Sequence, residues 1–203
     1  MIRIFWPAVI AVLARPALAE VIWSDEFDAG PQPDSAIWNY DLGAGGWGNR
    51  ELQAYTRSPE NVRVGDGRLV ITARAESDTD SNARFTSARI TTQHKLTFRY
   101  GIVEARIRIP NLGDGLWPAF WTLGNDFGAV GWPRCGEIDI MDFLVHDVDT
   151  VYFSRHFGNP YTHRGANFSG PDFSRDFHTF ALHWTGEEMS WFVDGALRYR
   201  TSL

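Results

Sequence analysis

The 203-residue sequence predicts an all-β protein, built as a sandwich or barrel of antiparallel strands. Short apolar or alternating runs follow one another closely, and turn residues such as Asp194-Gly195 separate them. Many short strands at this spacing are typical of antiparallel sheets. Beyond the N-terminal segment, no run keeps a helical period for three turns. The runs span residues 68–74, 87–93, 101–110, 137–143, 178–184 and 189–195.

The run GIVEARIRIP, residues 101–110, shows the strand pattern most clearly. Because successive side chains of a strand point to opposite faces, its apolar positions should pack together on one side. The residues expected to face the core are Val103, Ala105, Ile107 and Ile109, and those expected on the other face are Ile102, Glu104, Arg106 and Arg108.

The first 19 residues have the pattern of a secretory signal. Arg3 precedes an apolar run over residues 4–13, and the small-residue ending Ala17-Leu18-Ala19 follows. The run is too short to span a membrane, which leaves a cleaved signal or a buried first helix. We expect cleavage before Glu20, a catalytic domain over residues 20–203, and an extracellular or periplasmic protein.

Charge and cysteine content narrow the classes of partner. The formal net charge is -6, and loss of residues 1–19 with their two arginines would make it -8. An acidic surface repels phosphate, so we expect no nucleic-acid partner. The charge suits a neutral ligand instead. Cys135 is the only cysteine, so the chain has no internal disulfide. We expect a monomer without a membrane span.

Three carboxylates, Glu137, Asp139 and Asp142, lie within six positions among apolar residues. Strict alternation would put Glu137 and Asp139 on one face and turn Asp142 into the core, which would cost several kcal/mol, on the order of the desolvation of one charge. One extra residue bulging between Asp139 and Asp142 would bring all three onto one face.

Three acids on one face suit the hydrolysis of a glycosidic bond. Retaining hydrolysis needs two carboxyl groups about 5 to 5.5 Å apart, one to attack and one to donate a proton. A third carboxylate close by shifts the pKa values of its neighbours apart. The alternative is a polar edge strand whose acids only face water.

The segment GEIDIMD, residues 136–142, resembles the E-I-D-I-M-E signature of glycoside hydrolase family 16, in its laminarinase-like branch. Further blocks resemble that family in the same order from residue 21 to the C-terminus. The resemblance implies a β-jelly-roll of two antiparallel sheets with a concave cleft for a β-glucan chain. The blocks are 21–28, 45–56, 61–73, 85–92, 100–110, 115–124 and 191–195.

The resemblance also implies roles for single residues. Glu137 matches the nucleophile, Asp139 the helper carboxylate and Asp142 the general acid/base. His156 matches a histidine on the neighbouring strand. The implied substrate-binding residues are Asn49, Arg89, Trp117, Trp121 and Trp132, together with His156.

The aromatic content fits a sugar cleft but does not assign each ring. Flat aromatic platforms and hydrogen-bonding groups are what a sugar needs, and nine tryptophans are many for a sandwich of this size. Trp38, Trp184 and Trp191 stand in strand-like runs and are expected in the core. Arg89 suits a structural ion pair as well as a sugar contact.

Two departures from the family pattern matter. Asp142 stands where the family has Glu, which withdraws the carboxyl by roughly 1 to 1.5 Å, and a misplacement of about 1 Å costs on the order of a hundredfold in rate. The chain also ends eight residues after Gly195, where the family continues with further strands. We therefore expect the C-terminal strands of the jelly-roll to be missing.

The function expected is a secreted retaining endo-glycosidase acting on β-1,3- or mixed β-1,3/1,4-glucan in carbohydrate metabolism, weakened by Asp142. The rival is a glucan-binding, lectin-like protein without activity, and a transglycosylase outcome also stays open. No cofactor is implied, and a structural calcium ion, with Glu26 as a candidate ligand, is left open. Loops decide which polysaccharide such a scaffold binds, so the substrate follows only by analogy.

Overall fold

The computed structural model describes residues 2–6, 20–76, 84–111, 113 and 115–203. The chain divides into two compact units. The larger unit combines Met1–Ser24 with Phe98–Leu203, and the smaller unit is Asp25–Thr97.

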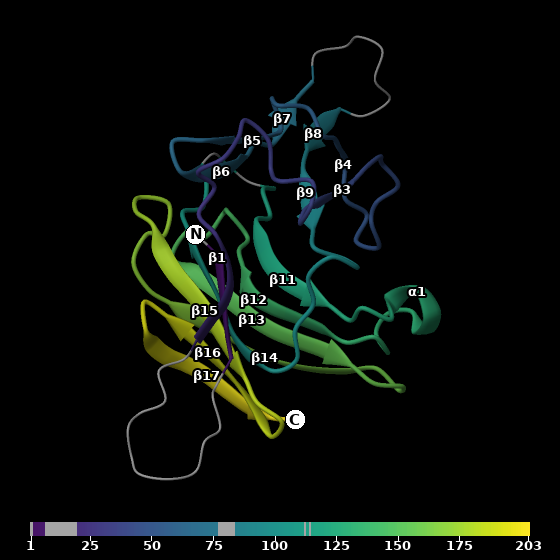
Figure 1. Ribbon diagram of the computed structural model, residues 1–203, viewed down its shortest axis with the longest axis vertical. Coiled ribbons are helices and arrows are strands. Elements are labelled where there is room, and N and C mark those ends of the chain that lie inside the picture. Colours follow the sequence, from purple (N-terminus) through teal and green to yellow (C-terminus); the bar gives the residue numbers. More distant parts are fainter. Residues whose placement is uncertain (1, 7–19, 77–83, 112, 114) are drawn as a thin grey trace. The chain divides into compact units, whose positions relative to one another are not determined.

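One sheet of the larger unit has six strands, in the order β17-β16-β15-β10-β1-β2 (Figure 1). In this sheet β1 pairs with β10, β10 with β15, β15 with β16 and β16 with β17, all antiparallel. Asp194 and Gly195 both have positive φ, 49° and 73°, and form the tight turn from β16 to β17 that the sequence predicts. The strands are β1 (Ile2–Trp6), β2 (Glu20–Asp25), β10 (Gly101–Ile107), β15 (His178–Trp184), β16 (Glu188–Val193) and β17 (Ala196–Ser202).

The second sheet of this unit has four antiparallel strands in the order β11-β12-β13-β14. A single helical turn, α1 (Phe127–Val130), lies between the first two strands. The strands are β11 (Ala119–Leu123), β12 (Glu137–Asp142), β13 (Thr150–Phe157) and β14 (Thr162–Ser169). In Figure 1 strands β11–β14 run from teal to green and strands β15–β17 from yellow-green to yellow.

The two sheets of the larger unit bury a shared core. Phe143 packs edge-on against Phe180 with ring centroids 6.0 Å apart, and the indole N–H of Trp191 donates to the carbonyl of Asp139 at 2.9 Å. The predicted sandwich of antiparallel sheets is therefore confirmed. Its fully buried large side chains are Ile140, Met141, Phe143, Val151, Phe153, Phe173, Phe180, Leu182, Trp191 and Val193.

Strand β10 alternates as its sequence predicts. Val103 and Ala105 are buried, whereas Ile102 and Glu104 are only half-buried and Arg106 is exposed. Trp191 lies in the core as expected.

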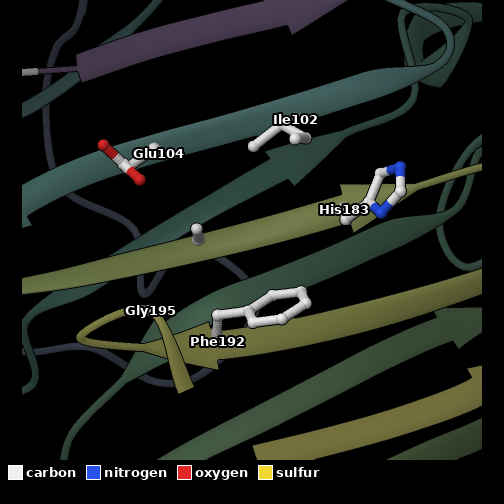
Figure 2. Close-up of a pocket in the computed structure, with 6 residues that line it drawn as sticks. Ile102, Glu104, His183, Phe192 and Gly195 are labelled. Carbon is white, nitrogen blue, oxygen red and sulfur yellow. The ribbon is translucent and has the colours of Figure 1, made fainter. Parts of the chain in front are cut away.

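The outer face of the six-stranded sheet carries a shallow depression of about 210 Å³. Figure 2 shows the ring of Phe192 on the strand that ends beside Gly195, with His183 on the next strand and Ile102 and Glu104 on the strand beyond it. The lining residues are Ile102, Glu104, Ala181, His183, Phe192 and Gly195. None of the residues predicted to form the site lines this depression.

The predicted export signal, residues 1–19, falls mostly outside the described residues. The part that is described, β1, pairs with β10, with Ile2 opposite Ala105 and Phe5 opposite Ile102. Among the residues that the structure describes, no helix has the length and apolar character needed to cross a membrane.

The smaller unit is built from short strands. They pair as β3-β9, β4-β8-β7 and β5-β6, and the β4/β8 pair is parallel. Trp38 is buried here as expected, and its indole N–H donates to Oδ2 of Asp25 at 2.8 Å. The strands are β3 (Asn39–Asp41), β4 (Gln53–Tyr55), β5 (Val62–Gly65), β6 (Arg68–Ile71), β7 (Arg74–Ala75), β8 (Phe85–Ser87) and β9 (Arg89–Thr91).

Candidate active site

Strand β12 contains the bulge that the spacing of its acids predicts. On one side Asp139 lies opposite Ser154 and Asp142 opposite Tyr152, so three steps along β12 match two along β13. On the other side the register with β11 shifts between Phe120 and Trp121. One extra residue therefore lies between Asp139 and Asp142, as predicted.

The bulge brings the three acids onto one face of the sheet. Direct cross-strand partners share a face, and the partners of Glu137, Asp139 and Asp142 on β13 are alternate residues. Ile138, Ile140 and Met141 are buried between the sheets instead. Glu137 and Asp142 are half-buried, and Asp139 is 8% exposed.

The Asp142 carboxyl has the protonation behaviour of a general acid. Burial is the largest effect on Asp142, and together with the nearby charges of Asp139 and Glu137 it raises the pKa of Asp142 to about 7. Hydrogen bonds to the carboxylate oppose this shift and lower the pKa. The indole N–H of Trp117 donates one of those opposing bonds, to Oδ1. A carboxyl with this pKa holds its proton near neutral pH, as proton donation to a leaving group requires.

His156 links the neighbouring strand to the acids. Its Nε2 lies 3.2 Å from Oδ2 of Asp139 and 3.8 Å from Oε1 of Glu137, and its Nδ1 lies 2.8 Å from the hydroxyl of Tyr161. The hydrogen bond to Asp139 raises the pKa of His156, while burial opposes that shift. The imidazole therefore holds the Asp139 side chain in place.

Three predicted tryptophans lie in the same unit as the acids. Trp121, on β11, is the direct partner of Asp139 and shares its face. Trp117 is 47% exposed and bonds to Asp142, and Trp132 is 49% exposed, with its ring centroid 6.0 Å from that of His156. The exposed indoles lie beside the acids rather than in the core.

Asn49 and Arg89 belong to the smaller unit, and the contacts described here for them are with other residues of that unit. Nε of Arg89 lies 2.8 Å from Oδ2 of Asp41, and the guanidinium lies 5.2 Å from the ring centroid of Trp47. Asn49 is exposed in a turn, where its backbone N–H donates to the carbonyl of Gly46 at 2.8 Å. The ion pair expected as the alternative for Arg89 is present, and a sugar contact by either residue stays a prediction.

The acids and the histidine also form a possible donor set for a metal. One ligand atom each from Glu137, Asp139 and His156 lie within 4.8 Å of one another. Carboxylate oxygen and imidazole nitrogen suit a divalent transition metal. Glu137, Asp139 and His156 are also residues to which the resemblance gives roles in hydrolysis and sugar binding, and we assign no metal here.

Two residues of the site were missed by the sequence reasoning. Tyr161 hydrogen-bonds to His156, and the ring centroid of His163 lies 4.9 Å from that of His156. The alternation of the apolar residues Ala166 and Phe168 with polar neighbours, after His156, is the signal that could have found them, since it predicts a second strand beside β13.

Comparison with known proteins gives the family. Residues 49–202 match the family model described as glycosyl hydrolases family 16. The chain belongs to this family. A beta-glucanase from Rhodothermus marinus is 45% identical over 189 residues, which cover 89% of this chain and 65% of the relative.

Two further members extend the likeness. A glucan endo-1,3-beta-glucosidase from Cryptopygus antarcticus is 39% identical over 208 residues, covering 98% of this chain and 75% of the relative. The laminarinase catalytic domain of Thermotoga maritima superposes with a TM-score of 0.83 at 45% identity, covering 90% of this chain and 77% of that one. The family and the jelly-roll sandwich expected from the sequence are thereby confirmed.

Proposed function

We propose that this family 16 member is a retaining endo-β-1,3-glucanase, with Glu137 as nucleophile and Asp142 as general acid/base. The observation that carries the proposal is the bulged strand, which places Glu137, Asp139 and Asp142 on one face with the pKa of Asp142 at about 7. A polar edge strand facing water would explain neither the bulge nor the burial of Asp139. The names of the relatives support the β-1,3-glucan substrate.

In the first step, a carboxylate oxygen of Glu137 attacks the anomeric carbon, and the bond from that carbon to the glycosidic oxygen breaks. The proton of Asp142 moves to the departing oxygen, so the leaving sugar departs as a neutral alcohol. In the second step, Asp142 takes a proton from water, and the hydroxide oxygen replaces Glu137 at the anomeric carbon. Two inversions give net retention.

Asp139 and His156 tune this chemistry. The charge of Asp139 raises the pKa of Asp142, and the bond with His156 at 3.2 Å orients the Asp139 side chain. The raised pKa keeps Asp142 protonated before the glycosidic bond breaks, so that its proton is available to the departing oxygen.

The rival is a binding protein that retains the cleft without the chemistry, and Asp142 is the residue that favours it. An assay of new reducing ends on laminarin, run beside a pull-down on insoluble β-1,3-glucan, separates the two. We expect new reducing ends, their loss in Glu137→Gln, and no change in the exposed control Glu187→Gln. Binding without any new reducing ends would select the rival.

Retention is tested separately from activity. Proton NMR of the first products should show the β-anomer before mutarotation, because two inversions restore the configuration. Initial formation of the α-anomer would contradict the role of Glu137 as nucleophile. Products longer than the substrate would show transglycosylation through the same intermediate. Mixed β-1,3/1,4-glucan in the same assay tests the breadth of the substrate range.

We also propose export, with the signal cleaved before Glu20, and a monomeric mature protein. Mass spectrometry of the protein recovered outside the cytoplasm should give an N-terminus at Glu20. Recovery of the chain with residues 2–6 still attached would contradict cleavage before Glu20. Light scattering should give the mass of one chain.

A further inference from the structure

Two charged side chains are buried among the residues that the structure describes, Asp139 and Arg155. Asp139 has a partner, since its Oδ2 lies 3.2 Å from Nε2 of His156. Arg155 is 8% exposed, its Nε has no hydrogen-bond partner, and no described carboxylate forms an ion pair with it. A buried guanidinium without a counter-ion is unfavourable, because burial removes the water that stabilises its charge.

Arg155 lies on the face of β13 that is opposite to the acids. Ser154 and His156 are the direct partners of Asp139 and Glu137, so the residue between them points to the other side of the sheet. There Cζ of Arg155 lies 4.2 Å from the ring centroid of Phe157. The unpaired charge is therefore separate from the proposed hydrolytic site.

A second arginine lies directly opposite the first. Arg164 on β14 is the cross-strand partner of Arg155 and is exposed, and its Nη1 donates to the carbonyl oxygen of His163 at 3.3 Å. Burial lowers the pKa of the Arg155 guanidinium, Tyr199 opposes that shift, and the charge of Arg164 adds to it. Two like charges in direct cross-strand contact repel each other, and an anion bound to both would remove the repulsion.

A third arginine lies farther along the same edge of the larger unit. Strands β14 and β17 are the edge strands of their two sheets and lie side by side (Figure 1). Cζ of Arg198 on β17 lies 3.8 Å from the ring centroid of Phe168 on β14. Phe168 is four residues from Arg164, roughly 13 Å at about 3.3 Å per residue. Asp194, which lies near Arg198, bonds instead to Nδ1 of His178 at 2.7 Å.

Protection of the sheet edges does not explain all three arginines. Charged side chains on edge strands hinder pairing with other chains, which would account for the exposed Arg164 and Arg198. It would not account for Arg155, which is buried on the next strand in. Arg200 shows how an arginine of β17 is otherwise neutralised, since its Nε lies 3.5 Å from Oε1 of Glu188.

We infer that Arg155, Arg164 and Arg198, the arginine row, bind sulfate or phosphate groups, either as the free ion or as substituents of a glycan. Arg155 and Arg164 hold one anionic group, and Arg198 meets a second group on the same glycan. The planar guanidinium matches the oxygens of sulfate and phosphate and forms charge-assisted hydrogen bonds with them.

Calorimetric titration of inorganic sulfate and inorganic phosphate into the full chain, at constant ionic strength, tests the first group. Arg155→Met should weaken binding at least about tenfold, as loss of a charge-assisted hydrogen bond predicts. Arg164→Gln should weaken it about twofold to fivefold, because an exposed charge contributes less. Arg200→Gln removes the same charge from an arginine that already has its carboxylate partner, and it should bind like the parent.

A sulfated galactan oligosaccharide, with its desulfated form as control, separates the two sources of the anion. If the glycan is the ligand, it binds more tightly than inorganic sulfate, and Arg198→Gln weakens its binding about twofold to fivefold without changing that of inorganic sulfate. Equal affinity for both, unchanged by Arg198→Gln, would assign the site to the free ion and remove Arg198 from it. Equal binding of the desulfated form would overturn the assignment to anions.

Thermal unfolding provides a readout that edge protection alone would not give. Sulfate should raise the melting temperature of Arg200→Gln and of the parent alike, and Arg155→Met should lose that rise while melting higher than the parent in chloride. Anion binding that Arg155→Met and Arg164→Gln leave unchanged, or no binding by the parent, would overturn the inference. If Arg155→Met fails to fold by circular dichroism, Arg164→Gln carries the test, because its side chain is exposed. None of these measurements uses turnover, so they stand apart from the proposed function.

Discussion

The indole N–H of Trp117 donates a hydrogen bond to Oδ1 of Asp142, so the residue expected to bind sugar also touches the proposed general acid. This bond stabilises the carboxylate and lowers the pKa of Asp142, against burial and the charges of Asp139 and Glu137, which raise it. The burial effect is the larger, and the pKa is about 7. Trp117 therefore limits how strongly Asp142 holds its proton.

Trp117→Phe should shift the alkaline side of the pH profile to higher pH. Loss of the hydrogen bond from the indole N–H destabilises the Asp142 carboxylate, so the pKa of Asp142 rises above about 7. The carboxyl therefore stays protonated to higher pH. The measurement is kcat/KM on laminarin from pH 5 to pH 10. Trp132→Phe is the control, since that indole is similarly exposed but its ring lies against His156. A shift of equal size in both variants would contradict the role of the bond.

Asp142→Glu should raise kcat on a β-1,3-glucan about tenfold to a hundredfold. The added methylene carries the carboxyl roughly 1 to 1.5 Å further toward the leaving oxygen, and a misplacement of about 1 Å costs on the order of a hundredfold. The measurement is initial rate at saturating laminarin, with Asp142→Asn as the inactive comparison. Unchanged or lower kcat would show that the bulge already places the shorter arm correctly.

Asp142→Asn should stabilise the fold at pH 8 but not at pH 4. The folded pKa of about 7 exceeds the ordinary 3.8, so the folded state loses stability as pH rises from about 4 to 7. An amide avoids the buried charge and still accepts the bond from Trp117. After allowance for partial exposure, we expect a gain of about 1 to 3 kcal/mol at pH 8.

Thermal or urea unfolding at both pH values measures this difference. Asp172→Asn is the control, because hydrogen bonds from Ser174 lower the pKa of Asp172 and the sign is opposite. It should give no gain at pH 8. Equal stability of Asp142→Asn and the parent at pH 8 would mean that ionisation of Asp142 does not lower the free energy of unfolding.

The sequence was enough to predict the bulge, because strict alternation would bury a charge and only an inserted residue avoids it. The all-β class and the alternating faces of β10 followed from the same two-residue period. Those features are local, and the side-chain pattern alone decides them.

The contacts of Tyr161 and His163 with His156 could not be predicted in this way. They depend on the pairing of β13 with β14, which puts His163 opposite His156, and on where the hairpin turn holds Tyr161. Register between strands is a property of the pair and not of either segment. The hydrogen bond from Trp117 to Asp142 has the same origin, since it joins the segment before β11 to the end of β12 through their side chains.

Trp191→Phe should destabilise the protein and lower kcat together. The indole of Trp191 is fully buried in the six-stranded sheet, and its N–H donates to the carbonyl of Asp139 at 2.9 Å, at the start of the bulge. Phe keeps most of the apolar volume but leaves that buried carbonyl without its donor, at a cost of about 1 to 3 kcal/mol. A shifted bulge would also move Asp142, so kcat should fall while KM changes little.

Trp184→Phe is the matched control for this prediction. Trp184 lies on the adjacent strand β15, and its buried indole nitrogen has no hydrogen-bond partner among the described residues. The same substitution there removes the same atoms without breaking a bond. Urea unfolding and kcat on laminarin should both show a larger loss in Trp191→Phe than in Trp184→Phe. Equal losses would mean that ring volume, and not the bond to Asp139, holds the catalytic strand.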